Sequence, residues 1–456
     1  MREIITIEIG QAGIQLGNAI WEQYSAEHSI NDAGKRMNTV KNDGFNVFFE
    51  EMQSGQFYKN KKLKVDLEPN VIDEVASGPS AALFNPAFLL SGKEDAANNF
   101  ARGHYTIGRQ MIDKVSDSLR KLMDNCDNAM GFMIAHSVGG GTGSGFGSLL
   151  LGQLAVNYRK KQKIGFEIYP SPTLSTCVVE PYNALLATHW LLDHTELSLV
   201  LDNEAIYGLC QNKLRIKKPD VGNLNRLISK VISSMTSPFR FNGELNVDLN
   251  ELQTNLVPFP RLHFMVTGMS PIFPKMDMRN APNDVQKITD DCFKPSYWLV
   301  QYTEFDPSED KYMAISLNYR GDVTSKEAGA TVGWLKSNQK LYLVEWCPTG
   351  FKIGLNELAP ACLEADDIGT FCKNAVMIGN NTGISRLFTK RIIQKFDYMY
   401  SQQAFVHWYV REGLEEAEFI EAREDLGFLE KDYLDVLLEQ PTDDYFSDNT
   451  DESGEY

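Results

Sequence analysis

A loop in which five of seven residues are glycine most constrains what this chain can fold into. The loop fills residues 139–145 (Gly-Gly-Gly-Thr-Gly-Ser-Gly) and follows an apolar stretch at residues 130–135 and the polar pair His136 and Ser137. Because glycine has no Cβ atom, successive backbone N–H groups can turn inward together and approach a phosphate closely. Thr142 and Ser144 would add hydroxyl donors. This order predicts a strand, a phosphate-binding turn and a helix.

The glycine loop matches neither common phosphate signature. No register of it gives G-x-G-x-x-G, and no lysine follows the glycines as a Walker-type loop requires. A dehydrogenase or an ordinary kinase is therefore disfavoured. The alternative is a flexible surface linker, but such linkers join polar segments. This loop joins an apolar run to the apolar, helix-like residues 146–154, which favours phosphate binding.

Residues up to about 203 alternate strand-like apolar runs with helical segments, as in a nucleotide-binding α/β domain. The first strand, residues 4–9, leads into Gly10, Gln11, Ala12 and Gly13, where small residues let a helix start close to a ligand and to the sheet. Gln11 would lie at the helix N-terminus and face phosphate. The same spacing could serve helix-on-sheet packing alone.

Two acidic and amide pairs fall at expected strand ends. They are Asp66 with Glu68, and Asp95 with Asn98. Oxygen ligands suit Mg²⁺, which keeps most of its waters and needs only one or two carboxylates beside a substrate phosphate. As plain sequence, however, either pair more often caps a helix than binds a metal.

A central amphipathic helix is predicted from apolar residues at helical spacing between Leu224 and Met235, and we expect Pro238 to end it. Asn223 and Asn225 at its start carry amides that could reach a base edge. The following residues 243–255 are dense in carboxylates and amides and read as an amphipathic connector.

The formal net charge of −17 is almost entirely local, because residues 412–456 carry −15 and the rest only −2. An acidic end disfavours nucleic acid and favours basic protein partners, although a solubilising tail fits the charge equally well. Acidic and apolar residues alternate up to about Leu438 and predict a helix with one charged and one apolar face. Beyond Pro441 we expect disorder.

Composition bounds the remaining possibilities. The chain has 456 residues with 43% hydrophobic content, enough for large cores and two or three domains. No apolar stretch has membrane-spanning length and no signal peptide is visible, which predicts a cytosolic protein. Seven scattered cysteines without a C-x-x-C pair predict buried free thiols and neither disulfides nor a zinc site. We expect His104 and His136 to be structural hydrogen-bonders rather than catalytic bases.

From Met1-Arg2-Glu3-Ile4 through the glycine loop to the terminal Glu455-Tyr456, the chain resembles the tubulin family over nearly its whole length. The resemblance implies a parallel-sheet α/β GTPase domain at residues 1–203 and a connecting region with the central helix at 204–240. It also implies an α+β intermediate domain at 241–381, a helical C-terminal region at 382–440 and an acidic disordered tail at 441–456. It places the protein in the cytoplasm, in the microtubule cytoskeleton.

The resemblance also implies the ligands, GTP and Mg²⁺, and the residues that contact them. Glu68 would contact the metal as well as the nucleotide. The nucleotide-binding positions carried over are Gln11, Glu68, Asp95, Asn98, Ser137, Gly140, Gly141, Thr142, Gly143, Thr176, Glu180, Asn203 and Asn225.

The segment after the central helix favours the α type of the family. Glu251 stands where α-type tubulins carry a catalytic acid and β-type tubulins a lysine, and the terminal Tyr456 matches a removable tyrosine. The resemblance therefore implies a heterodimer and filaments with β-tubulin, in which Glu251 completes hydrolysis of the GTP of the next subunit, supported by Asp248 and Asn246. Motor and microtubule-associated proteins are expected at the acidic C-terminal region.

Some positions depart from the family pattern. Val221 replaces an aromatic residue that stacks on guanine, residues 269–284 lack the histidine usual in the lateral loop, and the tail has no glutamate run. The altered Val221 and lateral loop are what an alternative could tolerate, a divergent α-like tubulin that acts as a specialised or regulatory lattice component, whereas the intact Glu251 favours a subunit that polymerises with β-tubulin. A metabolic nucleotide enzyme is disfavoured because no substrate-site triad or redox motif is present.

Overall fold

One ten-stranded sheet runs through the molecule. The computed structural model describes residues 3–37, 43–51, 58–171, 173, 177–241, 243, 245, 247–302 and 310–438. Its strands are β1 (Glu3–Ile9), β2 (Phe49–Glu51), β3 (Tyr58–Asn60), β4 (Lys62–Asp66), β5 (Leu89–Ser91), β6 (Ala129–Ser137), β7 (Gln162–Tyr169), β8 (Leu197–Asp202), β9 (Phe264–Ser270), β10 (Tyr312–Gly321), β11 (Phe351–Asn356) and β12 (Lys373–Asn381).

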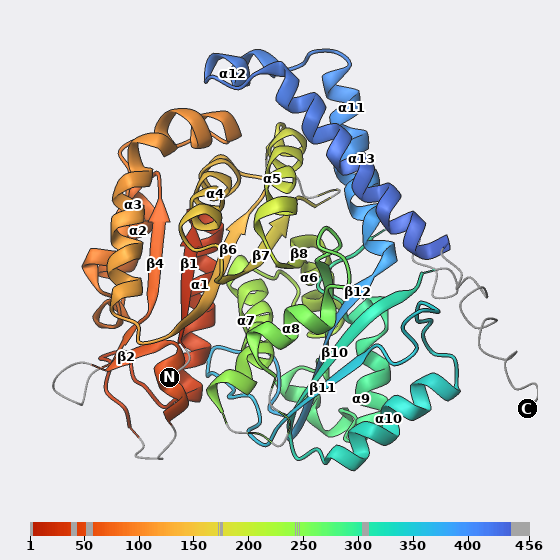
Figure 1. The fold of residues 1–456 in the computed structure, drawn as a ribbon. Coiled ribbons are helices and arrows are strands. Elements are labelled where there is room, and N and C mark those ends of the chain that lie inside the picture. Colours follow the sequence, from red (N-terminus) through yellow and green to blue (C-terminus); the bar gives the residue numbers. More distant parts are fainter. Residues whose placement is uncertain are drawn as a thin grey trace, which may run out of the picture.

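The large sheet has the order β11-β10-β12-β9-β8-β7-β6-β1-β4-β5, and β2 pairs with β3 alone. Every neighbouring pair from β5 to β9 is parallel, whereas β12 is antiparallel to both β9 and β10. Helices cover the sheet (Figure 1), which explains why β1 and β4 are buried along their whole length. The predicted parallel α/β fold is therefore confirmed.

The α-helices are α1 (Gly10–Glu27), α2 (Pro69–Ser77), α3 (Ile107–Asp124), α4 (Gly147–Asn157), α5 (Glu180–His194), α6 (Asn203–Asn212), α7 (Val221–Arg240), α8 (Leu249–Leu256), α9 (Val285–Cys292), α10 (Ser325–Ser337), α11 (Gln394–Tyr400), α12 (Val406–Arg411) and α13 (Glu416–Leu438). Short 3₁₀ or π segments include η5 (Thr142–Phe146), η6 (Lys275–Asn280) and η9 (Leu387–Ile393).

The parallel part of the sheet continues without a break from the predicted GTPase domain into the predicted intermediate domain at residues 241–381. Ser198 and Leu199 of β8 pair in parallel with Phe264 and Met265 of β9. The two halves therefore share backbone hydrogen bonds, and the division at residues 203, 240, 381 and 440 stays a prediction.

The central helix α7 does not end at Pro238, so that prediction was wrong. Pro238 lies inside the helix, which continues to Arg240. A proline cannot bond the carbonyl four residues before it. Here the hydroxyl of Ser237 donates to the Ser234 oxygen over 2.9 Å. The Ser237 hydroxyl thus replaces the missing backbone donor, and Arg240 Nη2 adds a bond of 2.7 Å to the neighbouring Ser233 oxygen.

Arg240 also joins three parts of the fold. Its guanidinium lies 2.6 Å from Glu27 of α1, and Arg320 of β10 lies 2.9 Å from the same carboxylate. All three side chains are fully buried. Although burial favours the neutral acid, the two guanidinium groups hold the pKa of Glu27 well below its usual range.

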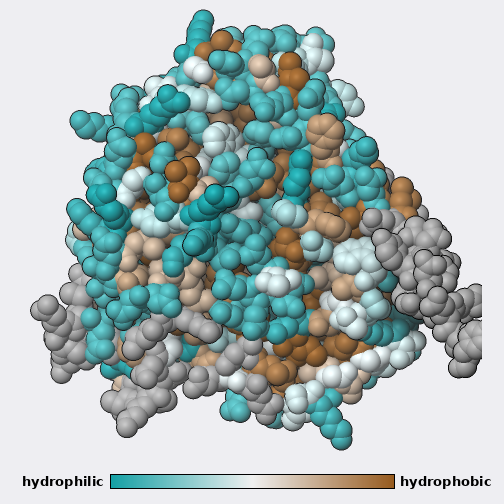
Figure 2. Space-filling model, viewed as in Figure 1, coloured by the Kyte–Doolittle hydropathy of each residue, from teal (hydrophilic) through white to brown (hydrophobic). Residues whose placement is uncertain are grey.

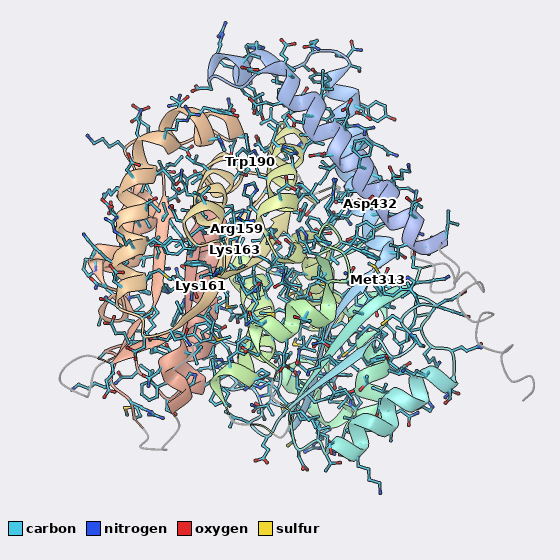
Figure 3. The ribbon with its side chains drawn as sticks, in the orientation of Figure 1. Arg159, Lys161, Lys163, Trp190, Met313 and Asp432 are labelled. Atoms are coloured by element: carbon cyan, nitrogen blue, oxygen red, sulfur yellow. The ribbon has the colours of Figure 1, made fainter. Side chains whose placement is uncertain are left out.

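The predicted helix near the C-terminus is confirmed as α13, which crosses the upper right of the molecule beside α11 (Figure 1). Salt bridges fasten it to the body: His189 lies 2.7 Å from Asp425, and Arg261 lies 3.7 Å from Asp432, labelled in Figure 3. The expected disorder beyond Pro441 and the terminal Tyr456 lie outside the described residues.

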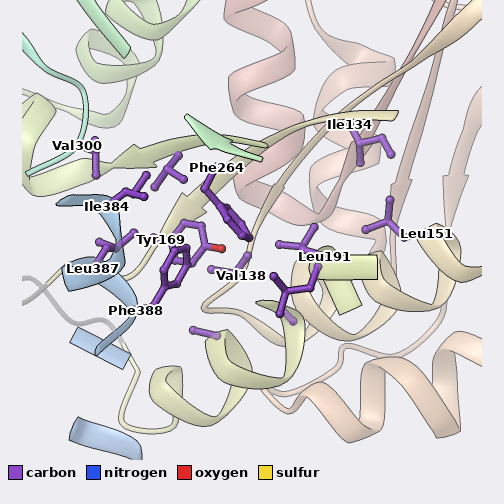
Figure 4. Packing of buried hydrophobic residues seen from close by; sticks show 14 of the residues in the cluster. Ile134, Val138, Leu151, Tyr169, Leu191, Phe264, Val300, Ile384, Leu387 and Phe388 are labelled. Atoms are coloured by element: carbon purple, nitrogen blue, oxygen red, sulfur yellow. The ribbon is translucent and has the colours of Figure 1, made fainter. Parts of the chain in front are cut away.

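A buried aromatic group connects the sheet to the C-terminal helices (Figure 4). The ring of Phe388 in η9 lies 4.7 Å from Phe264 of β9 and 5.9 Å from Tyr169 of β7. All seven cysteines are free thiols, as predicted, but the expectation that they are buried holds only for Cys210 and Cys292; four are half-buried and Cys372 is exposed. No helix within the described residues is long and apolar enough to cross a membrane.

Candidate nucleotide site

A pocket of about 370 Å³ opens at the carboxyl ends of the parallel strands. Ligands in open α/β sheets bind at this edge, because the loops that leave neighbouring strands meet there. Its lining residues are Ile9, Gly10, Gln11, Ala12, Asp66, Glu68, Asp95, Asn98, Ser137, Gly139, Gly140, Gly141, Thr142, Gly143, Ile168, Tyr169, Pro170, Ser171, Cys177, Glu180 and Asn203.

The first helix contributes Gln11, which is exposed at the start of α1. Gly10 has a φ of +71°, a conformation that favours glycine. Three residues on, a Cβ at Gly13 would lie 2.2 Å from the Ala135 oxygen in β6. The two predicted purposes of this glycine spacing, approach to a ligand and packing of the helix on the sheet, are both fulfilled. Gly10 lines the pocket and Gly13 packs on the sheet.

The glycine loop leaves β6 and starts the helical segment η5–α4. Thr142 lines the pocket as predicted, but Ser144 does not, because its hydroxyl donates to the Gly140 oxygen and the side chain is fully buried. The expectation that Ser144 faces a phosphate was wrong. Ser137 closes the loop by donating to Ile168 and accepting from the Gly139 N–H, each at 3.3 Å.

Acidic side chains gather at one corner of the pocket. Asp66 ends β4, Glu68 precedes α2, and Asp95 lies in the loop after β5. Burial raises the pKa of Asp66 to about 6, and the nearby Asp95 and Glu68 carboxylates add to the rise. Glu68 stands at the N-cap of α2 but makes no side-chain cap bond there.

Sequence reasoning missed Asn183, a fully buried amide on α5 that holds the pocket loops together. Its Nδ2 donates to the oxygens of Asn98 over 2.7 Å and Gly139 over 2.9 Å. Its Oδ1 accepts from the Phe100 N–H and from the Tyr409 hydroxyl. No pattern marks this residue, because it is one amide within the buried stretch 180–188 of α5.

His104 and His136 play no visible part in the pocket lining. Burial lowers the pKa of each imidazole to about 4, so both are neutral at physiological pH. His104 Nδ1 lies 3.2 Å from the Gly145 oxygen and steadies the end of the glycine loop. This contact is the structural role that was predicted for His104.

The far side of the pocket is formed by Glu180 and Asn203. Glu180 begins α5 and accepts from the Cys177 N–H over 3.1 Å, while Asn203 begins α6 directly after β8. Asn225 is buried in the first turns of α7 and is not among the lining residues. Thr176, also predicted to bind nucleotide, lies outside the described residues.

Asn223, near the start of α7, was predicted to reach a base edge, but its side chain is bonded within its own chain. Asn223 forms a capping box with Asp220, and its Nδ2 donates to Asp367 over 2.5 Å. Its amide is therefore engaged within the chain. Val221, the first residue of the helix, is 56% exposed and does not line the pocket.

Glu251, the predicted catalytic acid, lies on α8 and not in the pocket of its own chain. Its side chain is 48% exposed, and Oε2 lies 3.0 Å from Lys352 of β11. Asp248 caps the same helix through the Leu249 N–H, as a supporting residue would. Asn246, the other expected support, is outside the described residues.

Comparison with known proteins agrees with these features. The sequence model of the Tubulin/FtsZ family GTPase domain matches residues 3–211, and that of the tubulin C-terminal domain matches residues 260–393. The tubulin alpha-3 chain of Zea mays is 51% identical over 448 residues, which cover 97% of this chain and 98% of the relative. The tubulin alpha-1B chain of Physarum polycephalum is also 51% identical, over 97% of this chain and 99% of the relative.

Both family domains occur in one chain, and the relatives match it from end to end. The chain therefore belongs to the tubulin family, as an α-tubulin-type, GTP-binding subunit of the cytoskeleton with a GTPase domain.

Proposed function

We propose that this chain pairs with a β-tubulin, keeps one GTP with Mg²⁺ in its own pocket, and supplies Glu251 to hydrolyse the GTP of an adjacent β subunit in a microtubule. The single observation that carries the proposal is the shared pocket. Every predicted nucleotide-binding residue except Thr176 and Asn225 lines it.

Phosphate would lie over residues 139–143, which line the pocket just before and at the start of η5–α4 and would offer it backbone N–H donors. The side chains of Gln11 and Thr142 supply further donors. Asn203 and Glu180 lie beyond the glycine loop and offer amide and carboxylate groups to ribose or base. This distribution suits a nucleoside triphosphate with its phosphates at the sheet edge.

The acidic corner fits Mg²⁺. No group of three metal-ligating side chains occurs in the described residues, but Mg²⁺ needs only one or two carboxylates beside phosphate oxygens and waters. Glu68 and Asp95 would hold it, and a cation there would offset the carboxylate repulsion that adds to the effect of burial on the pKa of Asp66. When bound, Mg²⁺ neutralises charge on the phosphates.

The position of Glu251 supports action on a neighbour. An exposed carboxylate on α8, outside the pocket of its own chain, can orient a water only at a phosphate supplied by another subunit. Head-to-tail contact then completes the active site, and repeated contacts of this kind build open filaments.

The first test is the nucleotide content of the complex purified with a β-tubulin after exchange against labelled GTP. We expect one unlabelled, retained GTP per heterodimer beside one exchangeable nucleotide. Loss of the retained GTP, or no heterodimer, would contradict the proposal.

The second test is Glu251→Ala co-assembled with the same β-tubulin, with Asp113→Ala on the exposed face of α3 as a matched control. Filaments of the Glu251 variant should keep unhydrolysed GTP, and those of the control should contain GDP. Hydrolysis at the control rate in the Glu251 variant would remove Glu251 from the mechanism.

The acidic C-terminal region would receive motor and microtubule-associated proteins through charge. Residues 416–438 contain eight acidic and two basic side chains, and one of the basic ones, Arg423, makes two bonds to Asp397 of α11. The surplus of negative charge favours basic partners.

A second candidate, a specialised lattice component, rests on the segment η6. Met276 there is 99% exposed, while Asp277 lies 2.9 Å from Arg215 and Lys275 donates to the Glu364 oxygen over 3.0 Å. A lateral loop fastened to its own chain would give altered sideways contacts. Protofilament number in co-assembled microtubules distinguishes the two candidates.

A further inference from the structure

Two neighbouring residues between β5 and the π segment η4 (Arg102–Thr106) have an unfavourable backbone conformation. Ala97 and Asn98 have φ of +48° and +54°, in the left-handed region that residues other than glycine rarely adopt. Asparagine tolerates this region better than alanine does, and such a conformation persists only where the surroundings hold it. The same loop supplies Asp95 and Asn98 to the pocket lining. Whatever holds this loop therefore also holds two residues of the pocket.

The loop is held from two sides. On the inner side, Asn183 of α5 donates to the Asn98 oxygen over 2.7 Å. On the outer side, Asn99 Nδ2 donates over 3.1 Å to the oxygen of Trp408 in α12, which lies 309 residues further along the chain. The C-terminal part of the chain thus contacts a loop of the nucleotide pocket directly.

Arg102 connects the same loop to Glu412, at the carboxyl end of α12. Its Nε donates to the Asp95 oxygen over 3.0 Å, and its two Nη atoms lie 3.0 Å from Glu94 and 3.4 Å from Glu412. Glu412 also accepts from the Thr106 hydroxyl over 2.5 Å. Arg102 and Thr106 begin and end η4, so one carboxylate contacts both ends of this segment.

Packing buries little of α12. Val406 and Tyr409 are buried, whereas Trp408 and Val410 are 52% and 41% exposed. The helix lies at the top of Figure 1, and Figure 2 shows this region as a mostly hydrophilic surface with a few apolar side chains. Polar contacts therefore contribute much of what fixes α12 to the loop.

The pair Arg102–Glu412 is partly open to solvent. The two side chains are 30% and 21% exposed, and an isolated ion pair of this kind adds little stability. Here, however, both groups also bond other partners, and the contacts of one network reinforce one another. Glu412 is not part of the buried face of α13, so its replacement breaks the network and leaves that packing in place.

We propose that Glu412 is a positioning residue of the nucleotide site. Through Arg102 it holds the loop at residues 94–99 in the shape that presents Asp95 and Asn98 to phosphate and Mg²⁺. The inference rests on the proposed function, because it takes GTP with Mg²⁺ as the ligand of the pocket. It adds the connection between α12 and α13 to the site, although none of the described residues 405–418 lines the pocket.

The test uses the full chain as purified with its β-tubulin. Glu412→Gln keeps the size of the side chain and removes its charge. After chelation of Mg²⁺ the variant should lose its retained GTP about tenfold faster than the wild type, because the loop that carries Asp95 is held less firmly. Glu415→Gln, at an exposed position three residues away, is the matched control and should lose GTP at the wild-type rate.

Hydrogen exchange measures the loop itself, independently of nucleotide release. Backbone amides of residues 94–101 should exchange about tenfold faster in Glu412→Gln than in the wild type. If Glu412 only helped to attach α13, exchange would rise in residues 416–438 and stay unchanged in residues 94–101. The exchange pattern therefore separates a positioning role from a purely structural one.

A second variant checks that Glu412 acts through Arg102. Arg102→Lys keeps the positive charge but lacks the planar guanidinium that reaches three acceptors. It should also speed the loss of GTP, and the double variant with Glu412→Gln should be little faster than either single variant. Circular dichroism and thermal unfolding check that all variants keep their fold.

Three outcomes would overturn the proposal. They are wild-type exchange of residues 94–101 in Glu412→Gln, an additive effect in the double variant, and an equal effect of Glu415→Gln, which would reduce the result to surface charge. A wild-type protein without retained GTP would contradict the proposed function instead, and the exchange comparison would still decide on Glu412.

Discussion

Asn183 donates to the Gly139 oxygen over 2.9 Å, so a helix that covers the sheet holds the first glycine of the phosphate loop in place. The same amide nitrogen also donates to the Asn98 oxygen over 2.7 Å, in the neighbouring loop after β5. One buried side chain thus sets the spacing between two loops that would contact the same ligand.

Replacement of Asn183 by alanine should weaken both the pocket and the fold. The change leaves the Phe100 N–H, two loop oxygens and the Tyr409 hydroxyl without this partner. Each buried polar group left unpaired costs about 1–3 kcal/mol, so we expect a loss of about 2–4 kcal/mol in the free energy of unfolding. Thermal unfolding and retained GTP measure the two effects. Asn157→Ala, at an exposed position of α4, is the control; equal retention in both variants would contradict the role of Asn183.

Two glycines of the loop should respond differently to alanine. A Cβ at Gly143 would lie 2.3 Å from the Ser137 oxygen, whereas at Gly140 the nearest atom, Asn98 Oδ1, is 4.0 Å away. Gly143→Ala should therefore destabilise the fold by about 1–3 kcal/mol through overpacking. Gly140→Ala should fold normally and lose GTP, because its methyl group enters the pocket. Normal GTP retention by Gly140→Ala would show that phosphate lies elsewhere.

Ser237 and Pro238 should be energetically coupled. Ser237→Ala removes the donor that bonds the Ser234 oxygen, at an expected cost of about 1–2 kcal/mol. In a Pro238→Ala background the restored backbone N–H can bond the same oxygen, so the cost should largely disappear. Ser229→Ala is the control, since its hydroxyl donates to Arg226 in a stretch of α7 without proline. Additive effects in the double variant would exclude the coupling.

Glu167 should make stability depend on pH. This carboxyl in β7 is fully buried and accepts from Ser198 over 3.0 Å, and burial raises its pKa to about 8. In the unfolded chain the group ionises near 4.5, so between these values the unfolded state binds fewer protons. The contribution of Glu167 to stability is therefore present below about pH 4.5 and is lost as the pH rises to about 8, by up to about 1.4 kcal/mol per pH unit.

Comparison with Glu167→Gln isolates this effect. Burial lowers the pKa of His136 and His263 to about 4, so these groups act in the opposite direction as the pH falls below about 6.5. Both proteins contain them, and they cancel in the difference. The variant should gain stability relative to the wild type as the pH rises from about 5 to about 8. Parallel unfolding curves across this range would be incompatible with a protonated Glu167.

The sequence predicted the residues that line the pocket better than the contacts that hold their loops in place. Glycines at residues 139–143, Gln11 and Asn98 were found because each follows a strand, and strand ends meet at one edge of a parallel sheet. Asn183 was missed because a single amide within a buried stretch of helix has no distinctive spacing. Its role depends on loops from three other segments, which only the folded chain brings together.

The error at Pro238 has a similar origin. Proline usually ends a helix, but here the hydroxyl of the serine before it replaces the lost bond, and the arginine two residues after it bonds the adjacent Ser233 oxygen. Such compensation depends on side-chain rotamers, which the residue pattern does not reveal. The expectation that Asn223 lies near a base was wrong in a similar way. Its contact with Asp367, in a distant loop, could not be foreseen from the sequence.

The pairing of β8 with β9 limits how the molecule can be dissected. A fragment cut between α6 and β9 would expose the β8 edge on one piece and the β9 edge on the other. Unprotected edges recruit other strands and cause aggregation. The nucleotide-binding half should therefore be insoluble when it is expressed without the other half. The whole chain should unfold in one cooperative transition, so loss of nucleotide should also lower the stability of the half that does not bind it.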